Sequence, residues 1–147
     1  MNTAQQIINH SIIALLAAQF LKFITFSIKE KSLYPKALIS TGGMPSSHSA
    51  LVTSLTASIY LYEGVGLYFA ISLTLALVVI HDSMGIRLEA SKHAMMLNDI
   101  SEKLGLETEH INKGKALKEP LGHFPKEVFA GVILGILISI LGYYIGG

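Results

Sequence analysis

Three short motifs combine titratable side chains with the glycine and proline residues that shape loops and helix starts. They are residues 42–49 (GGMPSSHS), 82–87 (DSMGIR) and 122–127 (GHFPKE). Each motif lies at one end of an apolar segment of the chain. Titratable groups are costly near a membrane interior and are retained there mainly where they have a function. Two histidines, an arginine and two carboxylates at such positions predict a site for an anionic ester.

The first motif predicts a helix start that binds an anion. Pro45 suits the first turn of a helix, where its missing N–H costs nothing. The hydroxyls of Ser46 and Ser47 would then lie beside the free N–H groups of the helix start, which attract anions. His48 adds an imidazole that changes protonation near neutral pH. An ordinary helix cap with an interfacial histidine is the alternative explanation.

The last motif predicts an oriented imidazole. His123 and Glu127 are four residues apart, and Pro125 marks an early helical position between them. On one helix face the carboxylate can orient the imidazole and raise its basicity, as in activated nucleophiles. A capping role for Glu127 at the positive helix end is one alternative. A metal pair is another, but there is no convincing third ligand, so no metal and no other cofactor are predicted.

The middle motif supplies a phosphate-binding group. Asp82 closes an apolar segment, Gly85 breaks it, and Arg87 projects from its exit. A guanidinium is a planar fork that matches phosphate, and Asp82 can hold it in place or bind a cation. Lys22, inside the first apolar segment, can reach the same membrane face. The alternatives are an interface anchor for Arg87 and snorkelling to the headgroups for Lys22.

The composition indicates a membrane protein. Of 147 residues, 51% are hydrophobic and 14% are charged, against about 25% charged in soluble domains. The mean hydropathy is +0.53. The absence of cysteine excludes disulfides and thiolate–metal sites. A net charge of +1 indicates no nucleic-acid partner. The length suits a single membrane domain over residues 1–147.

Four apolar segments predict an all-α integral-membrane bundle, with spans at about residues 7–28, 47–62, 66–82 and 127–145. A membrane helix needs about 17–25 residues to cross. The second and third segments are short and joined by Glu63-Gly64-Val65, which predicts a tight helical hairpin. Residues 128–145 carry no charge and are apolar on every face, which suits lipid better than water.

Residues 86–122 are expected to form a cytoplasmic segment. From residue 86 to 104, apolar positions recur at alternating steps of four and three, which indicates an amphipathic helix with one mostly apolar face. Gly105 is expected to end this helix. We expect the helix to pack on the bundle or to lie at the membrane interface.

The basic residues predict the orientation. All eleven lysines and arginines lie at the inner end of the first span, in the loop after it, or between the third and fourth spans. The N-terminus, the hairpin turn and the C-terminal tail carry none. The positive-inside rule then places both termini outside and the three motifs at the cytoplasmic face, in a membrane such as the bacterial inner membrane.

Together these motifs resemble a known enzyme family. The string PSSH at residues 45–48 is similar to the Pro-Ser-x-His motif of the type-2 phosphatidic acid phosphatases, which are related to vanadium haloperoxidases. The string at residues 123–127, followed by Gly131 and Gly135, resembles their His-x-x-x-Asp motif leading into a helix. The longer strings, from Lys22 onward, are most similar to the divergent bacterial and plant branch of that group.

The resemblance implies catalytic roles. His123 would attack phosphorus and form a phosphohistidine, Glu127 would orient it, and His48 would protonate the leaving alcohol. The family has an arginine six residues before the nucleophile, and this position is Leu117 here, so Arg87 is the candidate substitute. The phosphate-binding candidates are thus Arg87, Lys22, Ser46, Ser47, Asp82 and Lys118. The implied activity is hydrolysis of a membrane lipid phosphate, either phosphatidate-like or an isoprenoid phosphate or diphosphate.

The sequence also departs from the family. Glu127 stands where the family has aspartate, there are fewer cations, and four spans replace six, which implies a homodimer that completes the fold. The alternative function is a non-enzymatic protein that binds or transports an anionic lipid with the same basic face. A further alternative keeps the fold but uses Asp82, Glu127 and a divalent cation.

Overall fold

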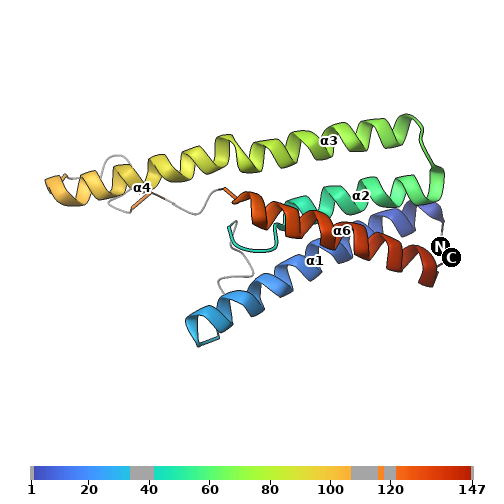
Figure 1. Cartoon of the computed structure of the whole chain (residues 1–147), viewed down its shortest axis with the longest axis horizontal. Helices are drawn as coiled ribbons and strands as arrows, with labels where there is room; N and C mark the ends of the chain where they lie inside the picture. Colours follow the sequence, from blue (N-terminus) through green and yellow to red (C-terminus); the bar gives the residue numbers. More distant parts are fainter. Residues whose placement is uncertain (1, 34–41, 107–115, 118–121, 147) are drawn as a thin grey trace.

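The computed structural model describes residues 2–33, 42–106, 116–117 and 122–146, and this part of the chain is helical without strands. Helices α1, α2, α3 and α6 lie side by side, and α4 continues the direction of α3 beyond them (Figure 1). The elements are α1 (Thr3–Glu30), α2 (Ser47–Glu63), α3 (Leu67–Met84), α4 (Ile86–Leu104) and α6 (Pro125–Gly146). The predicted all-α class is confirmed.

The lengths of the helices support an integral membrane protein. Among the described residues, three helices are long and apolar enough to cross a membrane: Thr3–Glu30, Leu67–Leu104 and Pro125–Gly146. The second of these is α3 continued by α4. The intervening α2 has 17 residues. The structure therefore supports three of the four expected spans, and a crossing by α2 stays a prediction.

The caps explain where the helices begin and end. Asn2 accepts a hydrogen bond from the Gln5 N–H, 2.8 Å away, so α1 begins earlier than residue 7. The N-cap of α2 is Ser46, whose hydroxyl accepts from the Ser49 N–H at 3.4 Å. The expected place of Pro45 in the first helical turn is therefore wrong. Proline has no side-chain oxygen to cap a helix, so the cap falls on the serine after it.

The predicted turns are confirmed. Gly64, with φ +73°, ends α2, and α3 begins three residues later, which makes the expected hairpin. Gly105, with φ +61°, ends α4. Both glycines adopt backbone conformations that residues with a Cβ rarely take. Pro125 is the first residue of α6, where its fixed φ suits a helix start.

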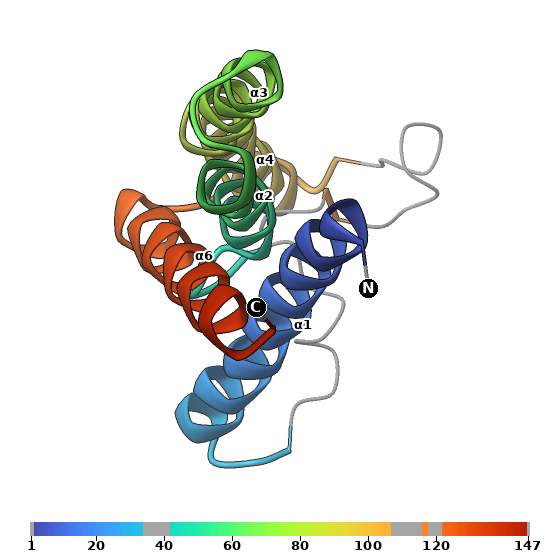
Figure 2. The ribbon, with the colours of Figure 1, turned by 90° about the vertical axis from the view of Figure 1, so that its right-hand side faces the viewer.

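Helix α2 lies at the centre of the bundle, between α1, α3 and α6 (Figure 2). Its largest interface is with α6. The two backbones approach closely because Gly135 faces α2: a Cβ there would lie 2.6 Å from the carbonyl oxygen of Ala50. Deeper in the interface, Ser139 is hydrogen-bonded to Ser54 at 2.9 Å and to Ser58 at 3.1 Å. Small residues and buried hydroxyls are the usual means of helix association in lipid.

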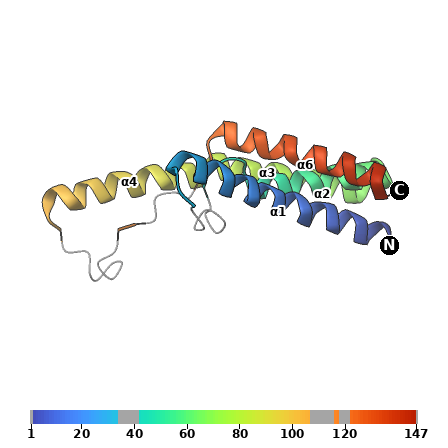
Figure 3. The ribbon, with the colours of Figure 1, turned by 90° about the horizontal axis from the view of Figure 1, so that it is seen from below.

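Helix α4 stands apart from the bundle. Among the helices it contacts only α3, and it extends alone past the end where α6 begins (Figure 3). One residue, Gly85, separates α3 from α4, so α4 keeps the direction of α3. The expectation that this helix packs on the bundle is therefore wrong, while a place at the membrane interface stays a prediction. Its apolar face is exposed, with Ile86, Leu97 and Leu104 at 73%, 54% and 67%.

Candidate functional site

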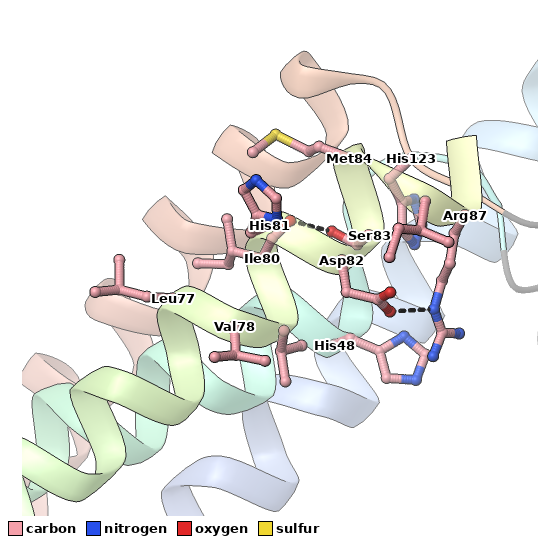
Figure 4. Close-up of a pocket in the computed structure, with 12 residues that line it drawn as sticks. His48, Leu77, Val78, Ile80, His81, Asp82, Ser83, Met84, Arg87 and His123 are labelled. Carbon is pink, nitrogen blue, oxygen red and sulfur yellow. Dashed lines mark hydrogen bonds and ion pairs between the residues drawn. The ribbon is translucent and has the colours of Figure 1, made fainter. Parts of the chain in front are cut away.

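The three motifs meet at one end of the bundle, where α2 and α6 begin and α3 ends. The Ser46 N–H donates to the Glu127 carbonyl oxygen at 2.9 Å, which joins the starts of α2 and α6. The His123 N–H donates to the Ser83 carbonyl oxygen at 3.0 Å, which joins the residue before α6 to the last turn of α3. Side chains from all three motifs therefore lie around one pocket (Figure 4).

His123 and Glu127 form the predicted pair. The Nδ1 atom of His123 lies 3.1 Å from Oε2 of Glu127, which also accepts the Phe124 N–H at 3.1 Å. An ionised carboxylate only accepts hydrogen bonds, so the proton of a neutral imidazole belongs on Nδ1. The Nε2 atom is buried and has no hydrogen-bond partner among the described residues. Its lone pair is therefore available to an electrophile.

The pocket has a polar end and an apolar side. Its volume is about 860 Å³. His48, Arg87 and His123 form the polar end, while Leu77 and other apolar residues of α3 line the side (Figure 4). Such a combination suits an amphiphile with an anionic group, because the chain and the charge are accommodated by different walls.

Two cationic side chains lie near His48. Arg87 is exposed, and its Nε donates to Oδ2 of Asp82 across 2.5 Å, so the expected pair is formed. Lys22 is fully buried, which differs from a lysine that snorkels to the headgroups. His48 lies within electrostatic range of His123, Arg87 and Lys22, and Lys22 lies within range of Glu127. The site therefore brings together groups from α1, α2, α3, α4 and α6.

The remaining predicted residues contribute unequally. The hydroxyl of Ser46 caps α2 and accepts from the Ser49 hydroxyl at 2.9 Å, so it already has partners. Ser47 is buried at the first position of the helix. Lys118 lies outside the described residues. No three His, Asp or Glu side chains within the described ranges gather in a metal-binding arrangement.

Contacts around the loop before α2 were not anticipated. The Thr25 hydroxyl donates to the Met44 carbonyl oxygen at 3.1 Å, which attaches this loop to α1. Gly43 has φ +94° and lies against the ring of Phe26, so a side chain there would be both strained and obstructed. The two glycines of the first motif are the sequence feature that could have predicted a close approach of this loop to a neighbouring helix. These contacts place the loop beside Lys22.

Comparison with known proteins shows the family of the chain. The profile of the family described as "Divergent PAP2 family" matches residues 3–138. A membrane protein of Bacillus subtilis (strain 168), YuiD, is 36% identical over 145 residues, covering 91% of this chain and 92% of that protein. No solved structure matches. With its helical bundle, its three grouped motifs and this match over most of its length, the chain belongs to the divergent PAP2 family of membrane proteins.

Proposed function

We propose that this membrane protein is a phosphatase that hydrolyses a lipid phosphate through a phosphohistidine. One observation carries the proposal: His123 is 2% exposed, its Nδ1 is held by Glu127, and its Nε2 is buried with no hydrogen-bond partner in the described part of the chain. A buried, oriented and unpartnered imidazole nitrogen is expensive to keep in a fold and is the arrangement that a nucleophile needs.

The reaction proceeds in two displacements. In the first, Nε2 of His123 attacks phosphorus, the bond from phosphorus to the leaving oxygen breaks, and His48 gives its proton to the leaving alcohol. In the second, a water attacks the phosphohistidine, His48 takes a proton from that water, and the phosphorus–nitrogen bond breaks to release phosphate. Lys22 and Arg87 neutralise the phosphoryl oxygens, which is the main requirement of phosphoryl transfer.

The pocket supports a lipid as the substrate. The apolar side, formed by α3, would take the hydrocarbon chain, and the polar end would take the phosphate. The N–H groups at the start of α2, beside Ser46 and Ser47, add further donors, and Lys118 remains a proposed contact. The substrate is then a phosphatidate-like lipid or an isoprenoid phosphate or diphosphate.

The charge pattern supports a cytoplasmic site. In the sequence, all eleven lysines and arginines lie at the inner end of the first span, in the loop after it or between the third and fourth spans, so we place the end of the bundle that carries the motifs in the cytoplasm and both termini outside. The substrate is then presented in the cytoplasmic leaflet, whose anionic lipids a basic surface attracts. A homodimer stays a prediction.

A phosphate-release screen of the purified protein in detergent tests the proposal. We expect release of phosphate from one or more lipid phosphates, the same rate with a chelator, and no release by His123→Ala. Loss of activity with the chelator would instead favour the cation-dependent mechanism through Asp82 and Glu127. Binding of lipid phosphate without release would favour the non-enzymatic function, which the exposed apolar residues Leu77 and Val78 beside the pocket also fit.

A further inference from the structure

Leu117, which lies between α4 and α6 in the sequence, is hydrogen-bonded to the side chain of Asn98 on α4. The Asn98 Oδ1 atom accepts from the Leu117 N–H at 2.8 Å, and its Nδ2 donates to the Leu117 carbonyl oxygen at 3.0 Å. A single amide therefore satisfies both backbone groups of one residue, as a neighbouring strand would. Replacing Asn98 would leave both groups of Leu117 without these partners.

Nearer the site, the backbone at Gly122 packs directly against the backbone at the start of α4. A Cβ at Gly122 would lie 2.7 Å from the carbonyl carbon of Arg87 and would overlap the backbone of Leu88. No side chain fits between the segment and the start of α4. The next residue, His123, donates its N–H to the Ser83 carbonyl oxygen at 3.0 Å. The junction of α3 and α4 thus holds the two residues that lead into α6.

We propose that Gly122 and Asn98 are positioning residues: Gly122 holds His123 against the start of α4, and Asn98 holds Leu117 against the same helix. The inference rests on the proposed function. The contact at Gly122 sets the backbone of His123 beside the backbone of Arg87, so one contact fixes the nucleophile relative to a phosphate-binding group. A displacement of about 1 Å in such an arrangement lowers the rate about 10²-fold.

The inference also gives α4 a role. Helix α4 adds nothing to the packing of the bundle, since among the helices it contacts only α3. Its 19 residues extend about 28 Å at 1.5 Å per residue. Asn98 lies beyond the middle of this length. In this proposal, α4 provides two contacts to the residues before α6: Asn98 binds Leu117, and the backbone of Leu88 lies against Gly122.

Kinetics of Gly122→Ala provide the first test. We expect kcat to fall about 10²-fold, with KM within about twofold of the wild-type value, because Lys22 and His48 lie on other helices. Gly66→Ala is the matched control. It adds the same methyl group where nothing lies within 4 Å, in an extended backbone with φ −153°. A folded Gly122→Ala protein with wild-type kcat would overturn the role of Gly122.

A second measurement does not depend on activity. Diethyl pyrocarbonate modifies accessible imidazoles, and mass spectrometry of peptides locates the product. His123 is 2% exposed and should react slowly in the wild type, whereas the exposed His93 should react fast and serves as the internal standard. We expect Gly122→Ala to make His123 react at a rate near that of His93. If the wild type releases no phosphate, the proposed function fails, and this measurement alone decides the inference.

Asn98→Ala covers the case in which Gly122→Ala does not fold, because it only removes atoms. We expect about a tenfold loss of kcat from two lost hydrogen bonds and greater reactivity of His123. Glu102→Ala, on the same helix and exposed, is the control and should match the wild type. Protection of His123 in folded Asn98→Ala and Gly122→Ala alike would overturn the proposal.

Discussion

The backbone N–H of Ser46 donates a hydrogen bond to the carbonyl oxygen of Glu127 across 2.9 Å. Ser46 is the N-cap of α2, and Glu127 lies in the first turn of α6. This bond joins the starts of two parallel helices that are distant in the sequence. His48 follows Ser46 by two residues, and Glu127 holds His123. The separation of the two histidines is therefore set by direct contact between two backbones.

The close packing of α2 against α6 should be sensitive to a single added methyl group. A Cβ on Gly135 would lie 2.6 Å from the Ala50 carbonyl oxygen and 2.9 Å from the Ser54 nitrogen. We expect Gly135→Ala to lower the free energy of unfolding by about 1–3 kcal/mol, the usual cost of overpacking. Chemical denaturation in detergent measures it, with Gly66→Ala as the control. Equal stability of the two variants would show that α2 and α6 can move apart enough to accommodate a methyl group without a loss of stability.

The two histidines should fail in different ways. His123→Ala removes the nucleophile and should abolish turnover of every substrate. His48→Ala removes only the acid, so an aryl phosphate, whose leaving group needs no proton, should recover part of the roughly 10²–10⁴-fold loss that general acid catalysis accounts for. Comparison of kcat on lipid and aryl phosphates measures the difference.

The phosphoenzyme gives an independent check on these roles. Wild-type protein quenched without acid should carry phosphate on His123, because phosphohistidine is labile in acid. An equal loss in both variants on all substrates, with no phosphoenzyme, would contradict the division of roles. Full activity of His123→Ala would rule out the phosphohistidine mechanism and favour the cation-dependent mechanism through Asp82 and Glu127.

Arg87 should not be replaceable by lysine. The guanidinium donates to Asp82 through Nε and retains further N–H groups for a phosphate, whereas an ammonium offers a point charge. We expect Arg87→Lys to lose about 1–3 kcal/mol of transition-state binding, measured as kcat/KM. Lys92→Arg, whose side chain pairs with Glu89 on the same helix, is a matched surface control. Unchanged kcat/KM in Arg87→Lys would identify Arg87 as an interface anchor.

The orientation can be tested directly because the chain has no cysteine. We expect a cysteine at Lys103, exposed on α4, to be shielded from an impermeant thiol reagent in intact cells. A cysteine at Val65, 80% exposed in the hairpin turn, should be labelled. The reason is that, in the sequence, all eleven lysines and arginines lie at the inner end of the first span, in the loop after it or between the third and fourth spans, and none lies in the hairpin turn. The reverse labelling pattern would move the site to the outside.

Local patterns predicted the helices well. The hairpin, the glycine at the end of α4 and the proline at the start of α6 depend on residues within one turn of each feature. The direction of α4 does not depend on such local residues. An exposed apolar face is indistinguishable in sequence from a packed one. Helix α4 leaves the bundle because it continues the direction of α3 beyond Gly85 (Figure 1). The number of spans is equally a matter of packing, since α2 is short and is surrounded by other helices.

In the site, pairs of residues close together in the sequence were predictable, whereas contacts between distant helices were not. The pair His123–Glu127 is four residues apart, so helical spacing indicated it. The pair Asp82–Arg87 was indicated by its place at the exit of an apolar segment. The burial of Lys22 could not be predicted, because it depends on the helices around α1. The two hydrogen bonds between Asn98 and Leu117 join residues that are 19 apart, a separation for which no spacing rule exists.

Helix α3 is the least embedded member of the bundle. Within the described chain it contacts α2, α4 and, less extensively, α6, but not α1. It also forms the apolar wall of the pocket, and it lies between Gly66 and Gly85. The nucleophile, its orienting carboxylate, the general acid and the buried lysine all belong to α1, α2, α6 or the residues just before α6. In the proposed enzyme, the helix that admits the lipid also holds the nucleophile, through the hydrogen bond from the His123 N–H to the Ser83 carbonyl oxygen, so a change in α3 would alter lipid admission and catalysis together.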